Sequence, residues 1–366
     1  MATFVKADAQ GFAYAGEKLR TGQLIAFPTE TVYGLGANAL DPEAVLSIFK
    51  AKGRPLTDPL IVHVPTIKEA VELVDLTEKG RLAFECLGRA FWPGPLTLIA
   101  KAVPALPLTV SANTGFVGLR CPAHPIAQAL LAAAKVPVAA PSANRFGHVS
   151  PTTAQHVMDD LGACGNIGII QGRDGDDEVA VCQVGIESTV AKIVPEENKL
   201  VIFRRGGISD KALAQVLAAN AELLGATYEI VTIQKEVQEN TTEAQQAPGQ
   251  LLTHYAPDVD TYLIQESAVE AFDAAKDDIS GWVVIDFNGK LRGLQHRVKA
   301  YNDLSPTGDI AEGTQNIFDM LRWAENVADV QRVVLTDVRD EDHELAAALH
   351  DRMFRASSGK LRSLRF

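Results

Sequence analysis

The sequence predicts an α/β protein in which a large first domain with a twisted mixed sheet precedes a smaller, Rossmann-like α/β domain. Between Leu24 and Ile193, short apolar runs typical of buried strands alternate with segments of helical periodicity. The stretch at 232–257 is polar and lacks apolar periodicity in its first half, and the alternation then resumes. We therefore expect three parts: a first domain at 1–231, a linker or mobile loop at 232–257 and a second domain at 258–366.

Composition favours an ordinary soluble protein. The chain has 366 residues, 47% of them apolar and 22% charged, which is enough to form two domains with separate cores. No apolar run is long enough to span a bilayer, and residues 1–8 lack the regions of a signal peptide. The four cysteines are scattered without a CxxC pair, which argues against a zinc site or a disulfide framework. We expect a cytoplasmic protein with no membrane association and no metal site of its own.

The charge is unevenly divided along the chain. The net charge of −12 disfavours a protein that coats nucleic acid. Residues 1–150 carry 14 Lys and Arg against 11 Asp and Glu, a net charge of +3, whereas the remainder carries −15. The first part is therefore the better host for an anionic ligand.

The elements of the first domain follow from the apolar runs and the residues that bound them. Asp41 and Pro42 favour a helix start, because aspartate caps the first turn and proline is tolerated there. Gly53 and Pro55 are stop signals for that helix. Strands are expected at 23–27, 60–64, 96–100, 117–120, 136–140, 167–170 and 188–193. Helices are expected at 11–21, from 41 to near 50–55, at 67–90, from near 124, and at 150–161 with Ser150 as N-cap and Pro151 in the first turn.

The second domain repeats the alternation at a smaller scale. Strands are expected at 261–264, 282–286 and 332–338, and helices near 267–275, 310–327 and 342–356. In the segment at 310–327, apolar residues recur near one helical face, which predicts that this helix packs on the sheet.

Polar residues gather directly after the strand predicted at 23–27. Pro28 ends this strand because it donates no ladder hydrogen bond, and the polar stretch 29–33 follows it. Gly34 and Gly36 would let a ligand approach the backbone, although a tight turn with solvated side chains is the other interpretation. The loose GxGxxA match here is not a dinucleotide fingerprint, because five residues separate it from the strand and the next helix has its own start.

Charged side chains recur at later element ends. Lys52 and Arg54 either complement a helix dipole or form a phosphate clamp, with lysine as a point charge and arginine as a fork. His63 lies inside the apolar run at 60–64, where it is either a packed core residue or a ligand contact. Arg120 ends a predicted strand, and open α/β sheets bind ligands at the carboxyl ends of their strands.

Hydroxyl, amide and guanidinium groups follow at Ser142, Asn144, Ser150, Ser188 and Arg204. The N–H groups of the helix expected to begin at Ser150 would favour an anion. No Ser-His-Asp order, activated cysteine or metal cluster stands out. The set favours chemistry that holds a phosphate compound and a small polar substrate in line, with little covalent participation by the protein.

A series of short motifs in the first domain resembles that of a known family. Between 28 and 190 the chain reads PTETVYGLGANA, KGRP, PLIVHV, WPGPLTL, LRCPAHP, APSAN, SPT and GIESTV. Together these closely resemble the YrdC-like domain of L-threonylcarbamoyladenylate synthase, whose KxR and SxN pair would be Lys52, Arg54, Ser142 and Asn144. PGQLLTHYAP at 248–257, the Rossmann-like part and His350-Asp351-Arg352 with Arg355-Ala356 resemble the long two-domain form. The resemblance covers essentially the whole chain.

The resemblance implies a nucleotidyltransferase that makes L-threonylcarbamoyl-AMP from L-threonine, bicarbonate and ATP, with release of pyrophosphate. It implies Mg²⁺ on the ATP phosphates and delivery of the product to the machinery that makes t6A at tRNA adenosine 37, together with weak tRNA binding. The implied catalytic residues are Lys52, Arg54, Ser142 and Asn144. The implied ATP contacts are Lys52, Ser142, Asn144, Ser150, Arg204 and Tyr255. The implied threonine contacts are Thr29, Arg54, His63, Arg120, Ala140 and Ser188.

The resemblance also implies that a lid closes over the pocket. At one point the sequence departs from the family's pattern. Tyr33 would pack against a ligand, and His254-Tyr255 in the linker would close over the pocket as a lid. Phe203-Arg204-Arg205-Gly206 stands where the family has Arg-Pro-Gly, which leaves open whether Arg204 or Arg205 contacts phosphate.

Two other functions stay open at this point. The first is a module that binds double-stranded RNA or tRNA without turnover, although the net charge of −12 and the lack of basic-aromatic stripes count against it. The second is a carbamoyl-transferring maturation enzyme that shares the domain. Such chains carry zinc-finger-like cysteine pairs and an acylphosphatase segment, and this sequence shows neither.

Overall fold

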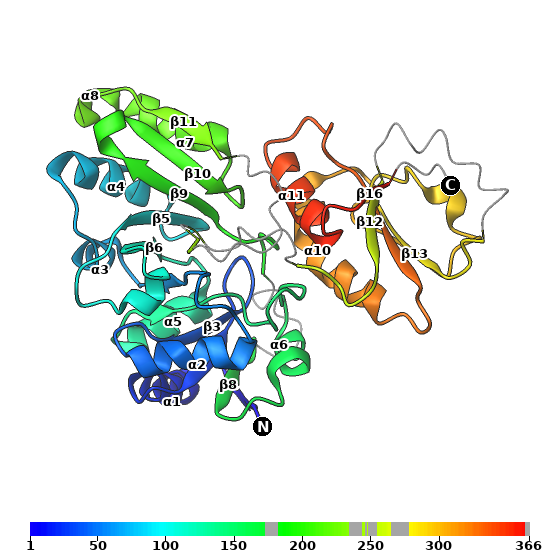
Figure 1. Cartoon of the computed structure of the whole chain (residues 1–366), viewed down its shortest axis with the longest axis horizontal. Coiled ribbons are helices and arrows are strands. Elements are labelled where there is room, and N and C mark those ends of the chain that lie inside the picture. Colours follow the sequence, from blue (N-terminus) through cyan, green and yellow to red (C-terminus); the bar gives the residue numbers. More distant parts are fainter. Residues whose placement is uncertain (173–181, 234–243, 246, 248–254, 265–277, 363–366) are drawn as a thin grey trace.

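The computed structural model describes residues 1–172, 182–233, 244–245, 247, 255–264 and 278–362. These residues form two units, each built on its own sheet (Figure 1). The predicted α/β class, with a large mixed sheet and a smaller second one, is confirmed. The domain boundaries stay a prediction, because most of 232–257 lies outside the described residues. Among the described helices, none is long and apolar enough to cross a membrane.

The first unit has an eleven-stranded mixed sheet in the order β1-β8-β2-β3-β7-β4-β6-β5-β9-β10-β11. Its strands are β1 (Thr3–Val5), β2 (Leu24–Phe27), β3 (Gly34–Asn38), β4 (Ile61–His63), β5 (Leu96–Lys101), β6 (Phe116–Arg120), β7 (Val138–Ala139), β8 (Ile167–Ile170), β9 (Thr189–Val194), β10 (Lys199–Arg204) and β11 (Glu229–Thr232). Its helices are α1 (Ala9–Arg20), α2 (Pro42–Lys52), α3 (Ile67–Glu72), α4 (Glu78–Phe91), α5 (Pro125–Ala134), α6 (Ala154–Leu161), α7 (Asp210–Ala219) and α8 (Ala221–Leu224).

The second unit has five parallel strands in the order β14-β13-β15-β12-β16. They are β12 (Thr261–Ile264), β13 (Trp282–Asp286), β14 (Ala300–Asp303), β15 (Arg332–Thr336) and β16 (Leu361–Arg362), with helices α10 (Ile310–Glu325) and α11 (Ala346–Ala356). The helix predicted near 267–275 lies outside the described residues. The Rossmann-like pattern is confirmed for the rest, and the strands β14 and β16 were not predicted.

Most predicted boundaries hold where the capping residues are local. Asp41 caps α2 as expected, since its carboxylate accepts hydrogen bonds from the N–H groups of Glu43 and Ala44 at 2.9 and 3.3 Å. Gly53 ends the same helix in the left-handed region, with φ 65°. A glycine adopts this conformation without steric cost, so the turn that carries Arg54 is set by the sequence.

Two predicted helices are wrong in their extent. The single helix at 67–90 is two helices, because Thr77 caps a new one and Val74 between them forms a β-bridge with Ala102. The helix expected from Ser150 begins at Ala154, where Thr153 is the N-cap. The prediction that Ser150 is a helix cap is therefore wrong, and the argument for an anion site from helix N–H groups at this residue no longer applies.

The stretch at 34–38 is a strand rather than a loop. It is β3, which pairs antiparallel with β2 and β7. Gly36 is needed there, because a Cβ would lie 2.8 Å from Val138 and 3.0 Å from Phe27. These glycines lie inside a sheet, which agrees with the rejection of a dinucleotide fingerprint.

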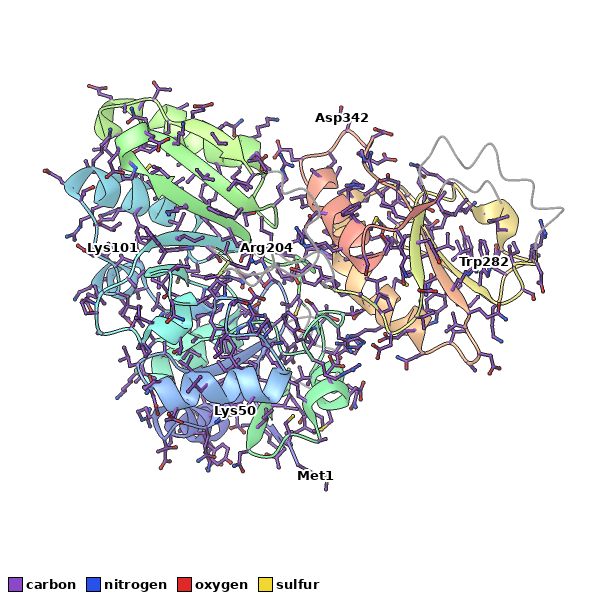
Figure 2. The ribbon with its side chains drawn as sticks, viewed as in Figure 1. Met1, Lys50, Lys101, Arg204, Trp282 and Asp342 are labelled. Carbon is purple, nitrogen blue, oxygen red and sulfur yellow. The ribbon has the colours of Figure 1, made fainter. Side chains whose placement is uncertain are left out.

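The two units meet through α10 and α11, which lie on the side of the small sheet that faces the first unit (Figure 1). Val149 and Ile186 of the first unit belong to the same buried apolar cluster as Phe318 of α10 and Met353 of α11. The contact between the units therefore includes an apolar core that both share. Arg204 lies near the middle of the molecule (Figure 2).

Candidate active site

A pocket opens in the first unit where several strands end, close to the second unit. Its empty space, counted with the solvent in its open mouth, is about 540 Å³. Its lining residues are Thr29, Thr31, Val32, Tyr33, Gly34, Arg54, Ile61, His63, Arg120, Ala140, Pro141, Ser142, Glu187, Ser188, Arg204 and Tyr255. Nine of the twelve ATP and threonine contacts implied by the resemblance are in this set, as is Tyr33. Of the other three, Lys52 and Ser150 donate hydrogen bonds to the lining residues Ser142 and Glu187, and the carbonyl of Asn144 accepts from Lys52.

The loop after β2 is tightly organised. The Thr29 hydroxyl donates to the carbonyl of Val32 at 2.7 Å and lies 2.8 Å from the hydroxyl of Thr31. Tyr33 is 1% exposed, and burial raises the pKa of its phenol. The interpretation of this stretch as a solvated turn is therefore wrong, since its side chains face inward. Ala140 stands opposite, with its Cβ 3.3 Å from the Cβ position of Gly34.

Arg120 is anchored at the end of β6 by two residues of that loop. Its guanidinium donates to the Glu30 carboxylate at 2.6 Å and to the Thr31 hydroxyl at 3.0 Å. Arg120 and Glu30 are both buried. The Arg120 Nε has no hydrogen-bond partner among the described residues. A buried ion pair thus fixes the group and leaves its Nε–H without a protein partner, so that it can donate to a ligand.

His63 lines the pocket with a neutral ring, and Arg54 lines it with a cationic group. Burial, together with the charge of Arg120, lowers the pKa of His63 to about 3, so its ring is neutral at ordinary pH. The His63 Nδ1 is buried without a partner within the described part of the chain. Arg54 forms an ion pair with Asp58 at 3.0 Å and donates to the carbonyl of Pro59 at 2.8 Å.

Lys52 turns away from its own helix end and into the protein. Its ammonium donates to the carbonyl of Ser142 at 2.6 Å and to the carbonyl of Asn144. Burial, followed by the charge of Arg54, lowers the pKa of Lys52 well below its ordinary value. The Asn144 amide in turn donates to the carbonyl of His148 at 2.8 Å. Lys52 therefore holds the loop that presents Ser142 to the pocket.

Ser188 and Arg204 form the opposite wall. Arg204 donates to the Ser188 carbonyl from Nε and Nη2, at 3.1 and 3.0 Å, and its side chain lines the pocket. Arg205 instead pairs with Asp210 at 2.8 Å. Of the two adjacent arginines, Arg204 is thus the one that faces the pocket.

Two further groups close the pocket on the side of the second unit. Tyr255 is 1% exposed and packs against Phe318 with ring centroids 5.5 Å apart, and burial raises the pKa of its phenol. His254, expected to act with it, lies outside the described residues. Glu187 accepts hydrogen bonds from Ser150 at 2.6 Å and from Arg352 of α11 at 2.9 Å.

Sequence reasoning missed the acidic partners Glu30, Asp58 and Glu187. Glu30 sits inside the PTETVYG motif and Asp58 lies four residues after Arg54, a spacing that signals an ion pair within reach. Glu187 gives no local signal, because its partners Ser150 and Arg352 are 37 and 165 residues away.

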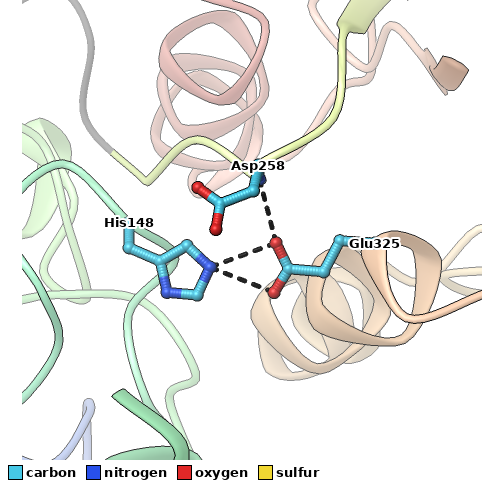
Figure 3. A group of neighbouring side chains, drawn as sticks. All are labelled: His148, Asp258 and Glu325. Atoms are coloured by element: carbon cyan, nitrogen blue, oxygen red, sulfur yellow. Dashed lines mark hydrogen bonds and ion pairs between the residues drawn. The ribbon is translucent and has the colours of Figure 1, made fainter. Parts of the chain in front are cut away.

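A second cluster lies outside the pocket, at the junction of the units. His148 contacts Glu325 of α10, and the ligand atoms of His148, Glu325 and Asp258 lie within 4.8 Å of one another (Figure 3). The His148 ring also bonds Asp160 through Nδ1 at 2.8 Å. Burial alone would lower the pKa of His148, but the carboxylates of Asp160 and Glu325 outweigh it and raise the pKa to about 9. We assign no metal here, because both ring nitrogens are already engaged as donors.

The chain matches two family profiles. Residues 17–206 match the Sua5/YciO/YrdC profile, described as "Telomere recombination", and residues 208–358 match "Threonylcarbamoyl-AMP synthase, C-terminal domain". The chain is 38% identical to the threonylcarbamoyl-AMP synthase of Pyrococcus abyssi over 68% of its length, and 40% identical to that of Bacillus subtilis over 67%. These alignments span 66% and 64% of the two relatives, just under two thirds.

A solved structure extends the similarity to both units. The crystal structure of P. abyssi Sua5 complexed with L-threonine superposes with a TM-score of 0.80 at 31% sequence identity. The match covers 99% of this chain and 98% of that one. The arrangement of the two units is therefore that of the solved relative.

Proposed function

We propose that this chain, which belongs to the Sua5/YciO/YrdC family and carries the threonylcarbamoyl-AMP synthase C-terminal domain, makes L-threonylcarbamoyl-AMP from L-threonine, bicarbonate and ATP. The observation that carries the proposal is the convergence of three guanidinium groups, Arg54, Arg120 and Arg204, on one buried pocket. Such a set suits a reaction that brings an anionic carbamate up to a triphosphate.

The threonine half of the pocket is assigned to Thr29, Arg54, His63, Arg120, Ala140 and Ser188. Arg120 would bind a carboxylate, because its Nε is buried and has no partner among the described residues. The neutral His63 ring offers a polar atom without adding charge, which suits the hydroxyl or amine of threonine. The small Ala140 side chain lines the pocket next to Gly34. The bound L-threonine of the solved relative supports this class of substrate.

The ATP half is assigned to Lys52, Ser142, Asn144, Ser150, Arg204 and Tyr255. Arg204 supplies a cation at the pocket wall, and Lys52 holds the loop from which Ser142 lines the pocket. Ser150 acts indirectly, since its hydroxyl is bonded to Glu187. Tyr255 would exclude water from the labile product, because it is buried at the mouth between the pocket and α10.

The reaction then follows from holding two anions together. The threonine amine and bicarbonate give a carbamate and water, and a carbamate oxygen attacks the α-phosphorus. The new P–O bond forms as the bond to the bridging oxygen breaks, and pyrophosphate leaves. The protein's part is to place the carbamate in line and to offset the negative charge with Arg54, Arg120 and Arg204.

The pocket residues do not fit a Mg²⁺ ion held by the protein. Glu187 is the one carboxylate among the described lining residues, and both of its oxygens already accept hydrogen bonds. Mg²⁺ is a hard cation that prefers oxygen ligands and usually keeps several waters. We therefore assign Mg²⁺ to the triphosphate alone and derive no step from it.

Downstream, the product would pass to the machinery that makes t6A at tRNA adenosine 37, with weak tRNA binding by this chain and a cytoplasmic location as further proposals. The test of the activity is pyrophosphate release with ATP, Mg²⁺, bicarbonate and L-threonine, leaving out one component at a time. We expect release only when threonine and bicarbonate are both present. Release that does not depend on threonine would contradict the proposed reaction, and salt-sensitive RNA binding without any release would favour the RNA-binding alternative.

A further inference from the structure

The second unit reaches the pocket through Arg352 of α11. This side chain is fully buried, and it is the largest such side chain among the described residues. Its Nε donates to Glu187 at 2.9 Å, across the junction between the units. The reaction derived above does not use Arg352, yet burying a guanidinium is costly unless it is paired. The groups that pair with this guanidinium therefore indicate its role.

The partner of Arg352 in the pocket is the carboxylate of Glu187. The carboxylate lines a pocket that is otherwise cationic and hydroxylic, and it is 6% exposed. One oxygen accepts the Ser150 hydroxyl and the other accepts Arg352. Without Arg352, an uncompensated negative charge would face the space assigned to the triphosphate and repel it.

The other contacts of Arg352 reach two more parts of the pocket. Nη1 donates to the carbonyl of Arg205 at 2.7 Å, which fixes the backbone next to Arg204. The guanidinium carbon lies 5.6 Å from the ring centroid of Tyr255, within reach of a cation–π contact. Asp351 accepts a third hydrogen bond from Nη1 at 3.0 Å and so helps to hold the fork in place. One side chain of the second unit thus contacts Glu187, Tyr255 and the segment that carries Arg204.

We propose that Arg352 is a positioning residue for nucleotide binding, which acts by neutralising Glu187 and by holding Tyr255 and the Arg204 segment at the pocket wall. The inference rests on the proposed function, because it assumes that the pocket binds a triphosphate. It assigns a role to the second unit: the pocket reaches its full affinity for ATP only when α11 is docked on the first unit.

The test compares four variants of the full-length protein with the unmodified chain. Arg352→Met removes the charge, Arg352→Lys keeps the charge but loses the fork, and Glu187→Gln removes the negative charge while keeping an acceptor for Ser150. The fourth is the double variant Arg352→Met with Glu187→Gln. Arg339→Met is the matched control, since Arg339 is exposed in the same unit and pairs with Asp337 there. Binding of a non-hydrolysable ATP analogue and of L-threonine is measured separately by calorimetry, and the KM for ATP by pyrophosphate release.

We expect Arg352→Met to weaken binding of the ATP analogue about ten-fold or more, because it leaves a buried charge unpaired. The KM for ATP should rise in parallel, with L-threonine binding changed much less, and Arg352→Lys should fall between. The double variant should recover most of the loss, since it removes both charges. A purely structural role would not give this rescue.

Two results would overturn the inference. One is unchanged binding of the ATP analogue in Arg352→Met, and the other is a double variant no better than Arg352→Met. If Arg352→Met fails to fold, the comparison of the double variant with Glu187→Gln decides the matter, and weaker binding in the double variant by more than about ten-fold would contradict charge neutralisation. If the unmodified chain binds no ATP analogue, the proposed function fails instead.

Discussion

Raising the pH from about 6.5 to about 9.5 should loosen the junction between the two units, because His148 loses its proton over this range. The protonated ring bridges Asp160 of the first unit and Glu325 of the second. The surrounding charges are Arg322, which pairs with Asp160 at 3.1 Å, and Arg145 with Asp258 at 2.7 Å. Asp160 and Asp258 thus each have an arginine partner, so the positive charge on His148 balances the negative charge of Glu325.

The size of the effect follows from the pKa of His148, which is about 9 in the folded protein. Its usual value is about 6.5, so the difference corresponds to roughly 3 kcal/mol of free energy of unfolding. The folded-state pKa is raised, so this stabilisation is fully present below about pH 6.5 and is lost as the pH rises through about 9. Burial would raise the pKa of Asp160, but hydrogen bonds from His148 and Arg322 outweigh it and lower that pKa to about 2. Asp160 therefore stays ionised over the whole pH range of the experiment.

The assay is an NMR titration of the His148 ring combined with urea unfolding at several pH values. We expect an apparent pKa near 9 for His148, and a urea midpoint that falls between pH 7 and pH 9.5 in the unmodified protein. His148→Gln should flatten that fall, whereas His296→Gln, at an exposed histidine of the second unit, should leave it unchanged. A His148 pKa below about 7, or the same pH dependence in His148→Gln, would refute the reasoning.

Three further changes test the pocket and its support. Lys52→Met should lower product formation at least about a hundred-fold, because the loop carrying Ser142 loses its anchor, whereas the exposed Lys50→Met should not. His63→Gln should raise the KM for L-threonine without changing the shape of the pH–rate profile between about pH 5 and 8, because the pKa of His63 is about 3. Gly36→Ala should cost about 1–3 kcal/mol in urea unfolding, since its Cβ would lie 2.8 Å from Val138.

Each of these has a result that would count against it. Normal turnover in Lys52→Met would remove the role given to the loop it anchors. A step near pH 6.5 that disappears in His63→Gln would mean that the ring titrates in the working range. The matched control for Gly36→Ala is Gly165→Ala, whose Cβ would meet open space, and equal stability losses in the two would contradict the packing argument.

Local patterns were enough to predict much of the pocket. Arg120 ends a strand, where open α/β sheets bind ligands, whereas His63 in its apolar run was equally compatible with a packed core residue. Both side chains line the pocket. The helix end at Gly53 could be predicted because its cap is set by neighbouring residues. The conformation of the chain is fixed locally at these points, so a short window of sequence contains the information.

Contacts between distant residues could not be predicted in this way. Ser150 looks like an N-cap because proline follows it, but its hydroxyl bonds Glu187 and the helix begins later. Lys52 looks like a cation at a helix end, yet its partners are carbonyls 90 and 92 residues away. The two charges of the Glu187–Arg352 pair lie in different units, so only the packing of α11 brings them together.

The most direct test of the central claim is mass spectrometry of the product formed from ATP, L-threonine and bicarbonate. We predict a threonylcarbamoyl-AMP mass that requires all three substrates and that increases when the bicarbonate is labelled with carbon-13. Pyrophosphate should appear in equal amount. AMP without a carbon-13-labelled adduct, or no product in a protein that binds ATP, would contradict the proposed reaction and leave a nucleotide pocket with another chemistry.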